Sequence, residues 1–195
     1  MDLDTQFYPF AYHKGKVTTF KRGTEFARSY FGGPADFKVK GIEHGPKKLH
    51  HIASILNSDV GLDVHGHGGF LPFYYGMCFD GCELEYSCSY MGYITINKME
   101  PVESIDDWPY DDYPRYLPYF PLEVDEQSEV SNEQIIERLC QYVDEVSDDT
   151  FVFVVPSNPE LGFSMWGPSG DAEGVELIFL FDTKTGTVRI HNVCS

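Results

Sequence analysis

The run HGHGG at residues 65–69 contains the side chains whose types and spacing most readily suggest chemistry. The imidazoles of His65 and His67 can bind Zn²⁺, Ni²⁺ or Fe²⁺, and Asp63 is a candidate third ligand. The same pattern is also typical of an ordinary glycine-rich turn, and its spacing defines no further ligand. A small enzyme that uses a divalent transition metal held by His65 and His67 is therefore one alternative prediction.

The cysteines have a weaker metal-binding pattern. Cys78, Cys82 and Cys88 are separated by three and five residues, unlike the paired C-x₂-C ligands of structural zinc sites. Cys82 and Cys88 fall on one face of a predicted strand, where we expect them to pack as small hydrophobic side chains. The chain has five cysteines, an odd number, and residues 1–10 lack the features of a signal peptide. Reduced thiols and a cytoplasmic location are therefore expected.

No familiar catalytic motif occurs in the sequence. It contains no G-x-S-x-G, H-E-x-x-H, Walker A or G-x-G-x-x-G pattern. His50 and His51 fall on a predicted helix, where adjacent side chains point about 100° apart, so we expect them on a solvated flank. We predict no catalytic residues, and a non-enzymatic role is favoured.

A strongly acidic stretch carries most of the net charge. Residues 101–150 contain fifteen acidic residues against Arg115 and Arg138, a local net charge of −13 out of −17 for the chain. Its first part, the acidic ribbon of residues 101–130, also contains six aromatic residues and five prolines. Prolines favour an extended, semi-rigid chain. The ribbon predicts a protein-recognition surface, although aromatic rings that fold back onto a sheet are an equally good explanation.

The acidic ribbon contains the partner-binding residues that we predict. Its carboxylates could meet arginine or lysine on a partner, and its rings offer contact area. It lacks the spacing of a calcium-binding loop. The predicted contact residues are Asp106, Asp107, Trp108, Tyr110, Asp111, Asp112 and Tyr113.

The net charge of −17 restricts the partners. Such a protein repels nucleic acid and anionic membranes, whereas it attracts a basic protein. We predict a non-catalytic acidic binding protein that neutralises a basic protein partner by occlusion, as an immunity protein does with its cognate toxin. An inhibitor that mimics nucleic acid is a second alternative. The simplest explanation is that the acidity only maintains solubility, and residues 1–48, with a net charge of +4, could pair with the acidic stretch inside the fold.

Two segments have the hydrophobic period of amphipathic helices. In the segment at about 45–58, Pro46 suits a first helical position, and Leu49, Ile52 and Leu56 recur on one face. In the segment at about 132–146, Ser131 and Gln134 form a capping box before the apolar positions.

Strand patterns fill most of the remaining chain. Residues 150–156, TFVFVVP, are apolar without alternation and predict a buried central strand. Residues 175–182 and 187–193 flank Thr185-Gly186 and predict a hairpin.

The expected fold class is α+β, a mostly antiparallel sheet with two main amphipathic helices, in a single compact domain spanning 1–195. The order of elements also permits an internal repeat of two α-β-β-β halves, 45–98 and 131–193, joined by the acidic ribbon.

Overall fold

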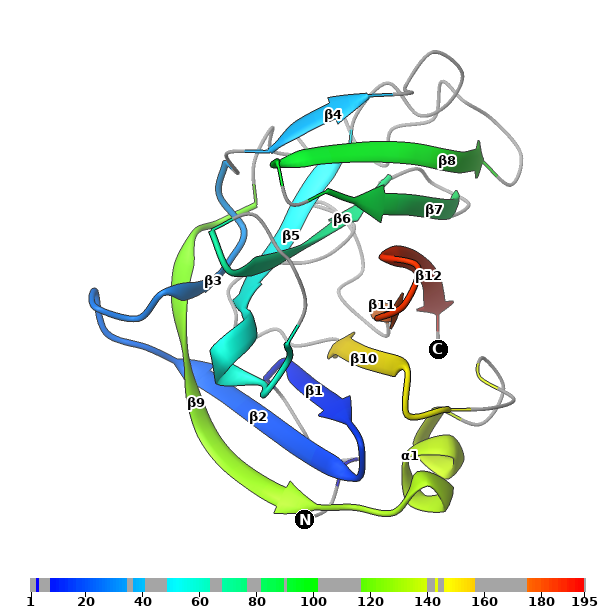
Figure 1. The fold of residues 1–195 in the computed structure, drawn as a ribbon. Helices are drawn as coiled ribbons and strands as arrows, with labels where there is room; N and C mark the ends of the chain where they lie inside the picture. Colours follow the sequence, from blue (N-terminus) through cyan, green and yellow to red (C-terminus); the bar gives the residue numbers. More distant parts are fainter. Residues whose placement is uncertain are drawn as a thin grey trace.

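The computed structural model describes residues 3, 8–34, 37–40, 49–63, 68–76, 82–89, 91–101, 117–139, 143, 146–156 and 175–194. Within them the chain forms one curled sheet and one short α-helix (Figure 1). The strands are β1 (Phe10–His13), β2 (Lys16–Arg22), β3 (Ser29–Phe31), β4 (Lys38–Lys40), β5 (His50–Leu56), β6 (Phe70–Tyr75), β7 (Cys82–Cys88), β8 (Tyr93–Pro101), β9 (Phe120–Glu129), β10 (Thr150–Val155), β11 (Val175–Asp182) and β12 (Thr187–Cys194). The helices are the 3₁₀ turn η1 (Asn57–Asp59) and α1 (Asn132–Leu139).

The twelve strands have the order β4-β8-β7-β12-β11-β10-β1-β2-β9-β3-β5-β6. Eleven of them follow one another in antiparallel pairs, and only β4 joins its neighbour β8 in parallel. The predicted α+β class with two main helices is therefore wrong: the described chain is mostly β. No helix among the described residues is long and apolar enough to cross a membrane.

The helix predicted at about 45–58 is wrong, because its described part forms β5. Six of the seven β5 residues are buried, and the strand lies between β3 and β6. A strand that is buried on both faces has no exposed polar alternation, so its sequence resembles that of a short buried helix. Residues 45–48 lie outside the described residues.

The second expected helix is shorter than the predicted 132–146. The capping box is present: the Ser131 amide donates to Gln134 Oε1 at 3.0 Å, and the Gln134 amide donates to Ser131 Oγ at 3.3 Å. Helix α1 then ends at Leu139, and Val143 and Val146 are buried beyond it in non-helical backbone. The box therefore determines where the helix begins, and tertiary packing buries Val143 and Val146 outside it.

The proposed α-β-β-β halves do not match in this fold. The second half begins with α1, whereas strand β5 occupies the corresponding place in the first half. The acidic ribbon is also not only a connection between halves. Its residues 120–129 form β9, which pairs with β2 on one side and β3 on the other. Residues 102–116 of the ribbon lie outside the described residues.

Strand β10 is the buried central strand that its sequence predicts. It pairs with β1 and β11 in the middle of the sheet. Phe151, Phe153 and Val155 belong to the core inside the curl, whereas Val152 and Val154 belong to a second core on the opposite face. The absence of polar alternation follows from burial on both faces. The β11–β12 hairpin is also confirmed, with Asp182 Oδ1 accepting the amides of Lys184 and Thr185 in its turn.

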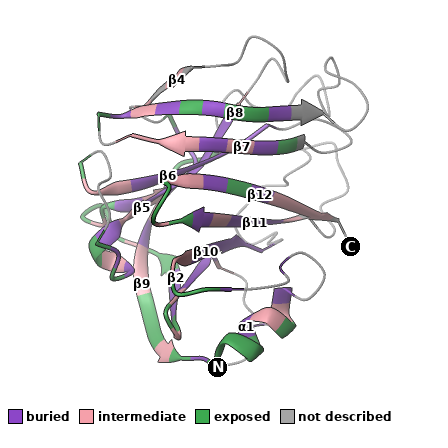
Figure 2. Ribbon diagram, turned by 45° about the vertical axis from the view of Figure 1, so that its right-hand side comes forward, coloured by how far each residue is buried: buried purple, intermediate pink, exposed green. Residues whose placement is uncertain are grey.

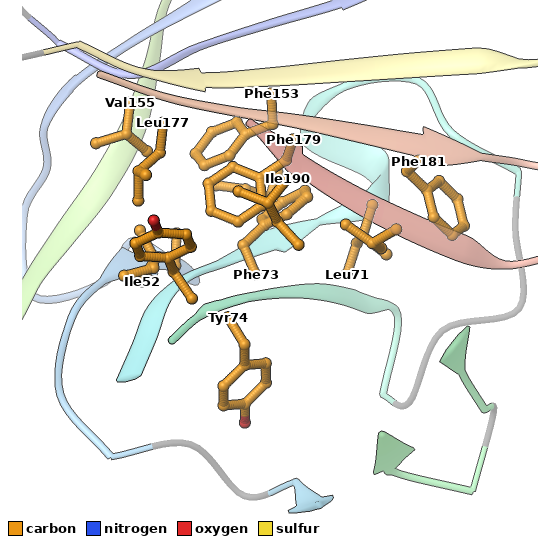
Figure 3. Close-up of a cluster of buried hydrophobic side chains, with 14 of the residues drawn as sticks. Ile52, Leu71, Phe73, Tyr74, Phe153, Val155, Leu177, Phe179, Phe181 and Ile190 are labelled. Atoms are coloured by element: carbon orange, nitrogen blue, oxygen red, sulfur yellow. The ribbon is translucent and has the colours of Figure 1, made fainter. Parts of the chain in front are cut away.

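The inner core is built around stacked aromatic rings (Figure 3). The ring of Phe73 lies 4.5 Å from that of Phe153, at an interplanar angle of 17°, and 4.9 Å from that of Phe179. These residues come from β6, β10 and β11, so the curl brings the last strand of the sheet against the central ones. All three side chains are fully buried.

The outer core lies between α1 and the opposite face of β1, β10 and β11. Ile135 and Leu139 of α1 pack with Phe10, Val154 and Ile178. Arg138, on the same helix, donates from Nη1 to Glu176 Oε1 on β11 at 3.0 Å and also bonds Glu176 through Nη2. Figure 2 shows buried residues along β10 and β11 and exposed ones on the outer side of α1.

One tyrosine connects the last strand of the curled sheet to the third strand. The backbone amide of Tyr74 on β6 donates to the hydroxyl of Tyr86 on β7 at 3.0 Å, and that hydroxyl donates to the carbonyl of Pro72 at 3.0 Å. Strand β6 is the last strand of the sheet and β7 is the third. The curl is therefore closed at this point by a side chain rather than by a backbone ladder.

Candidate functional site

Most residues predicted to function lie outside the described part of the chain. These are His65 and His67 of the glycine-rich run and all seven predicted contact residues of the acidic ribbon, Asp106, Asp107, Trp108, Tyr110, Asp111, Asp112 and Tyr113. Asp63 is described and exposed. In the described ranges, no three His, Cys, Asp or Glu side chains gather into a group able to hold a metal ion. The metal site and the ribbon contacts remain predictions from the sequence.

Cys88 behaves as a packing residue. It is partly buried against the inner core and forms no disulfide. Burial raises the pKa of its thiol to about 12, so the nucleophilic thiolate is scarce at neutral pH. The side chain of Cys82 lies outside the described part of the structure. That Cys82 and Cys88 share one face of the strand therefore remains a prediction.

Part of the acidic stretch pairs with the basic N-terminal segment inside the fold. Strand β9 lies beside β2, which places Lys16 opposite Glu129 and Lys21 opposite Glu123. Lys21 Nζ also lies 2.9 Å from Asp125 Oδ1, with both side chains about half exposed. The Lys21 contacts partly neutralise Glu123 and Asp125, whereas Glu129 lies across the ladder from Lys16 without an ion pair among the described residues. The acidic surface available to a partner is therefore smaller than the sequence suggests.

A second group of acidic residues is exposed and has no ion pair in the described chain. This helix-end surface comprises Glu129, Glu133, Glu137 and Asp148, at the end of β9, on α1 and in the turn before β10. Glu133 and Asp148 both lie near the buried Tyr12 hydroxyl: burial raises the pKa of Tyr12, and these two charges raise it further. Glu133 and Glu137 are one helical turn apart, where like charges repel, and hydrogen bonds to the backbone and to Ser131 at the start of α1 lower the pKa of Glu133.

An open groove lies beside the helix-end surface. It has a volume of about 840 Å³ and runs between the β1–β2 turn and the end of β9. Gln127, Ser128 and Ser131 line it with polar groups, and Lys14 and Lys16 contribute positive charge. The groove could accept a polar side chain of a partner, and of the helix-end surface only Glu129 lines it.

An aromatic strip that the sequence analysis did not identify lies near the other end of β9. The ring of Tyr30 lies 5.5 Å from that of Tyr119 and 6.3 Å from that of Phe70, and the Arg28 guanidinium lies 5.5 Å from the Phe70 ring centroid. Phe26 is 84% exposed at the edge of a groove next to Arg28. Arg28 immediately precedes β3 and Tyr30 lies within it, and three strand residues are too few for sequence periodicity to identify.

His51 and Ser54 form a buried pair with the geometry of a base and a hydroxyl nucleophile. His51 Nε2 lies 2.9 Å from Ser54 Oγ, and His51 Nδ1 lies 3.0 Å from the carbonyl oxygen of Gly32. A base held by a third group is the usual way to activate a serine. Ser54, however, is fully buried, and the rings of Tyr30 and Tyr74 lie against His51. The pair therefore links β5 to the end of β3. The expected solvated location of His50 and His51 is wrong, because both are buried in β5.

The stability of the fold should fall with acidification because of His51. Burial lowers the pKa of His51 to about 4, whereas a free histidine titrates near 6.5. The unfolded chain binds this proton first, so stability is complete above about pH 6.5 and is lost as the pH falls toward 4, by about 2–3 kcal/mol. The measurement is urea unfolding from pH 7.5 to 4.5, for the wild type and for His51→Gln.

His51→Gln keeps a donor and an acceptor but cannot titrate. Carboxylates and other histidines change both proteins alike, so the difference between the two pH profiles isolates His51. Parallel profiles would show that His51 is not held neutral by the fold.

The described residues thus present two exposed features, the helix-end surface and the aromatic strip, together with one buried histidine–serine pair. No protein-family model, curated protein or solved structure matches this chain.

Proposed function

We propose that this chain is a non-catalytic binding protein that docks on a basic protein partner and occludes it, as an immunity protein occludes a toxin that acts on nucleic acid. The observation that carries the proposal is the helix-end surface. Its four carboxylates are exposed, lie around one helix, and have no ion pair among the described residues. Like charges gathered on one exposed surface are reasonable where a partner supplies the opposite charge.

The field of such a surface acts mainly on the rate of association. A chain with a net charge of −17 attracts a basic protein over a distance of about one Debye length, roughly 8–10 Å at physiological salt. Steering of this kind raises the association rate, while contacts at the centre of the interface determine how long the complex lasts. The acidic ribbon, with the predicted contacts Asp106, Asp107, Asp111 and Asp112, would extend the same surface chemistry. A cytoplasmic location, predicted from the cysteines, is part of the proposal.

The test is binding to the purified products of the genes that flank this one, with cytochrome c as an unrelated basic protein. The variant Glu129→Gln/Glu133→Gln/Glu137→Gln/Asp148→Asn should associate with a cognate basic partner about tenfold more slowly, and its salt dependence should be flatter. Stopped-flow or surface-based kinetics at several salt concentrations measure both quantities.

A control variant removes the same amount of charge elsewhere. Glu25→Gln/Asp63→Asn/Glu83→Gln/Glu85→Gln reduces the net negative charge equally, at positions away from α1. Among the described residues it breaks only the largely exposed ion pairs of Glu83 with Lys98 and Glu85 with Arg189. A third variant changes Asp106, Asp107, Asp111 and Asp112 to asparagine. If the helix-end variant and the control slow association equally, only net charge matters and the surface has no special role. If no flanking product binds, or the one that binds is acidic, the proposed function is wrong.

A further inference from the structure

The two ends of the sheet are protected from further strand pairing in different ways. At one end, β4 is only three residues long and contains Lys38 and Lys40, and short charged strands discourage pairing. At the other end, β6 has the sequence FLPFYY, with no charge at all, and five of its six residues are buried. Once its edge is exposed, no charge on this strand would oppose its pairing with β6 of a second copy.

The hydroxyl of Tyr86 occupies backbone groups on β6 that a further strand would use. It accepts from the Tyr74 amide and donates to the Pro72 carbonyl, both at 3.0 Å. These residues are two apart, so their backbone groups leave the strand along the same edge. Pro72 has no amide hydrogen to offer. One side chain therefore fills an acceptor and a donor on the edge of the terminal strand.

The location of Tyr86 makes this contact a closure of the sheet. Tyr86 is fully buried, and its ring meets the Tyr74 ring edge-on, with centroids 6.2 Å apart. It belongs to β7, whereas β6 lies at the far end of the strand order. In the described fold, no ladder joins β6 to β7, so the Tyr86 hydroxyl provides the hydrogen bonds that hold these strands together at this point.

We propose that Tyr86 is a latch that withholds the β6 edge from strand pairing, and that the strand it excludes is β6 of a second copy of this chain. Antiparallel pairing of β6 with itself, centred on Phe73, places Pro72 of each copy opposite Tyr74 of the other. The two Tyr74 amides then donate to the two Pro72 carbonyls, and the groups used are those that Tyr86 holds in the monomer. The latch is independent of the helix-end surface.

The test replaces Tyr86 with phenylalanine, which removes the hydroxyl and retains the ring. The Tyr74 amide should then exchange with solvent about tenfold faster or more, since a buried donor loses its partner. The dimer fraction should rise with protein concentration above that of the wild type. Hydrogen exchange read by NMR and sedimentation velocity measure the two effects.

Tyr12→Phe is the matched control. It also removes a buried tyrosine hydroxyl, one that bonds the Gly15 amide and Asn132, but it lies in the outer core away from β6. This variant should be less stable without increased self-association. Equal self-association of the two variants, or unchanged exchange at Tyr74 in Tyr86→Phe, overturns the proposal.

If Tyr86→Phe fails to fold, a measurement on the wild type tests whether the β6 edge has a latch. In native-state hydrogen exchange with low urea, the Tyr74 amide should exchange through an opening of β6 that exposes less surface than global unfolding. Exchange of this amide only through global unfolding would show that β6 has no separate latch.

Discussion

Replacing Phe73 with alanine should lower the free energy of unfolding by about 3–5 kcal/mol, the usual cost of emptying a buried phenylalanine site. The Phe73 ring is fully buried and lies 4.5 Å from Phe153 and 4.9 Å from Phe179. Its neighbours are fixed on the two central strands β10 and β11, which cannot move to fill the space without breaking their ladder. The loss also removes the ring contacts that link β6 to β10 and β11. Guanidinium unfolding monitored by circular dichroism measures the change.

Phe26→Ala provides the matched control for this prediction. Phe26 is 84% exposed, so the same truncation should change stability by less than about 0.5 kcal/mol. The two variants remove the same atoms, and burial is what differs between them. Equal losses of stability would contradict the stacked inner core.

The second large effect should come from Glu176→Ala, which we expect to cost about 3–5 kcal/mol. Glu176 and Arg138 are only 12% and 18% exposed, and the guanidinium reaches both carboxylate oxygens. Removing the carboxylate takes away the two hydrogen bonds and the opposite charge that Glu176 provides to the largely buried Arg138 guanidinium. Arg138 Nε also donates to the Leu3 carbonyl at 3.2 Å, so the ion pair connects α1, β11 and the N-terminal segment. Urea unfolding measures the loss.

Two comparisons separate the buried pair from ordinary surface charge. Asp125→Ala breaks the pair with Lys21, whose side chains are 51% and 52% exposed, and should cost no more than about 1 kcal/mol. The double variant Arg138→Met/Glu176→Leu removes both charges and should recover most of the stability, because no unpaired charge remains buried. If the double variant is as unstable as Glu176→Ala, the packing of the Arg138 and Glu176 side chains, and not their charges, stabilises the contact of α1 with β11.

Local signals in the sequence correctly identified several elements. The S-x-x-Q capping box before α1 requires only neighbouring residues, and both of its hydrogen bonds form. The apolar run of β10 and the turn before β12 are also short-range patterns. The hydrophobic period at about 45–58 predicts a helix, whereas residues 50–56 form β5, because a strand buried on both faces lacks the polar alternation that identifies a strand. Burial on both faces depends on β3 and β6, which sequence periodicity does not reveal.

The sequence predicts the acidic character of the candidate surface but not the position of its acidic residues in the fold. The excess of acid from residue 101 to residue 150 is visible in the sequence, and Glu133, Glu137 and Asp148 come from it. The pairing of β2 with β9 decides which acidic side chains face a lysine of the same protein. These two segments lie more than a hundred residues apart in the sequence. The aromatic strip likewise gathers Tyr30, Phe70 and Tyr119 from three separate segments. Only contacts of long sequence separation bring these groups together.

The sequence by itself determined the acidity of the protein, the start of α1, the central strand β10 and the final hairpin. These features depend on composition or on residues within a few positions of one another, where local hydrogen bonds and turn geometry decide the outcome. The tertiary structure alone decided that residues 50–56 are a strand, that β9 is neutralised in part by β2, and that Tyr86 closes the sheet onto β6. The reason is that curling a sheet of twelve strands brings distant backbone edges and side chains into contact, and these contacts outweigh the weak local preferences of the segments that make them.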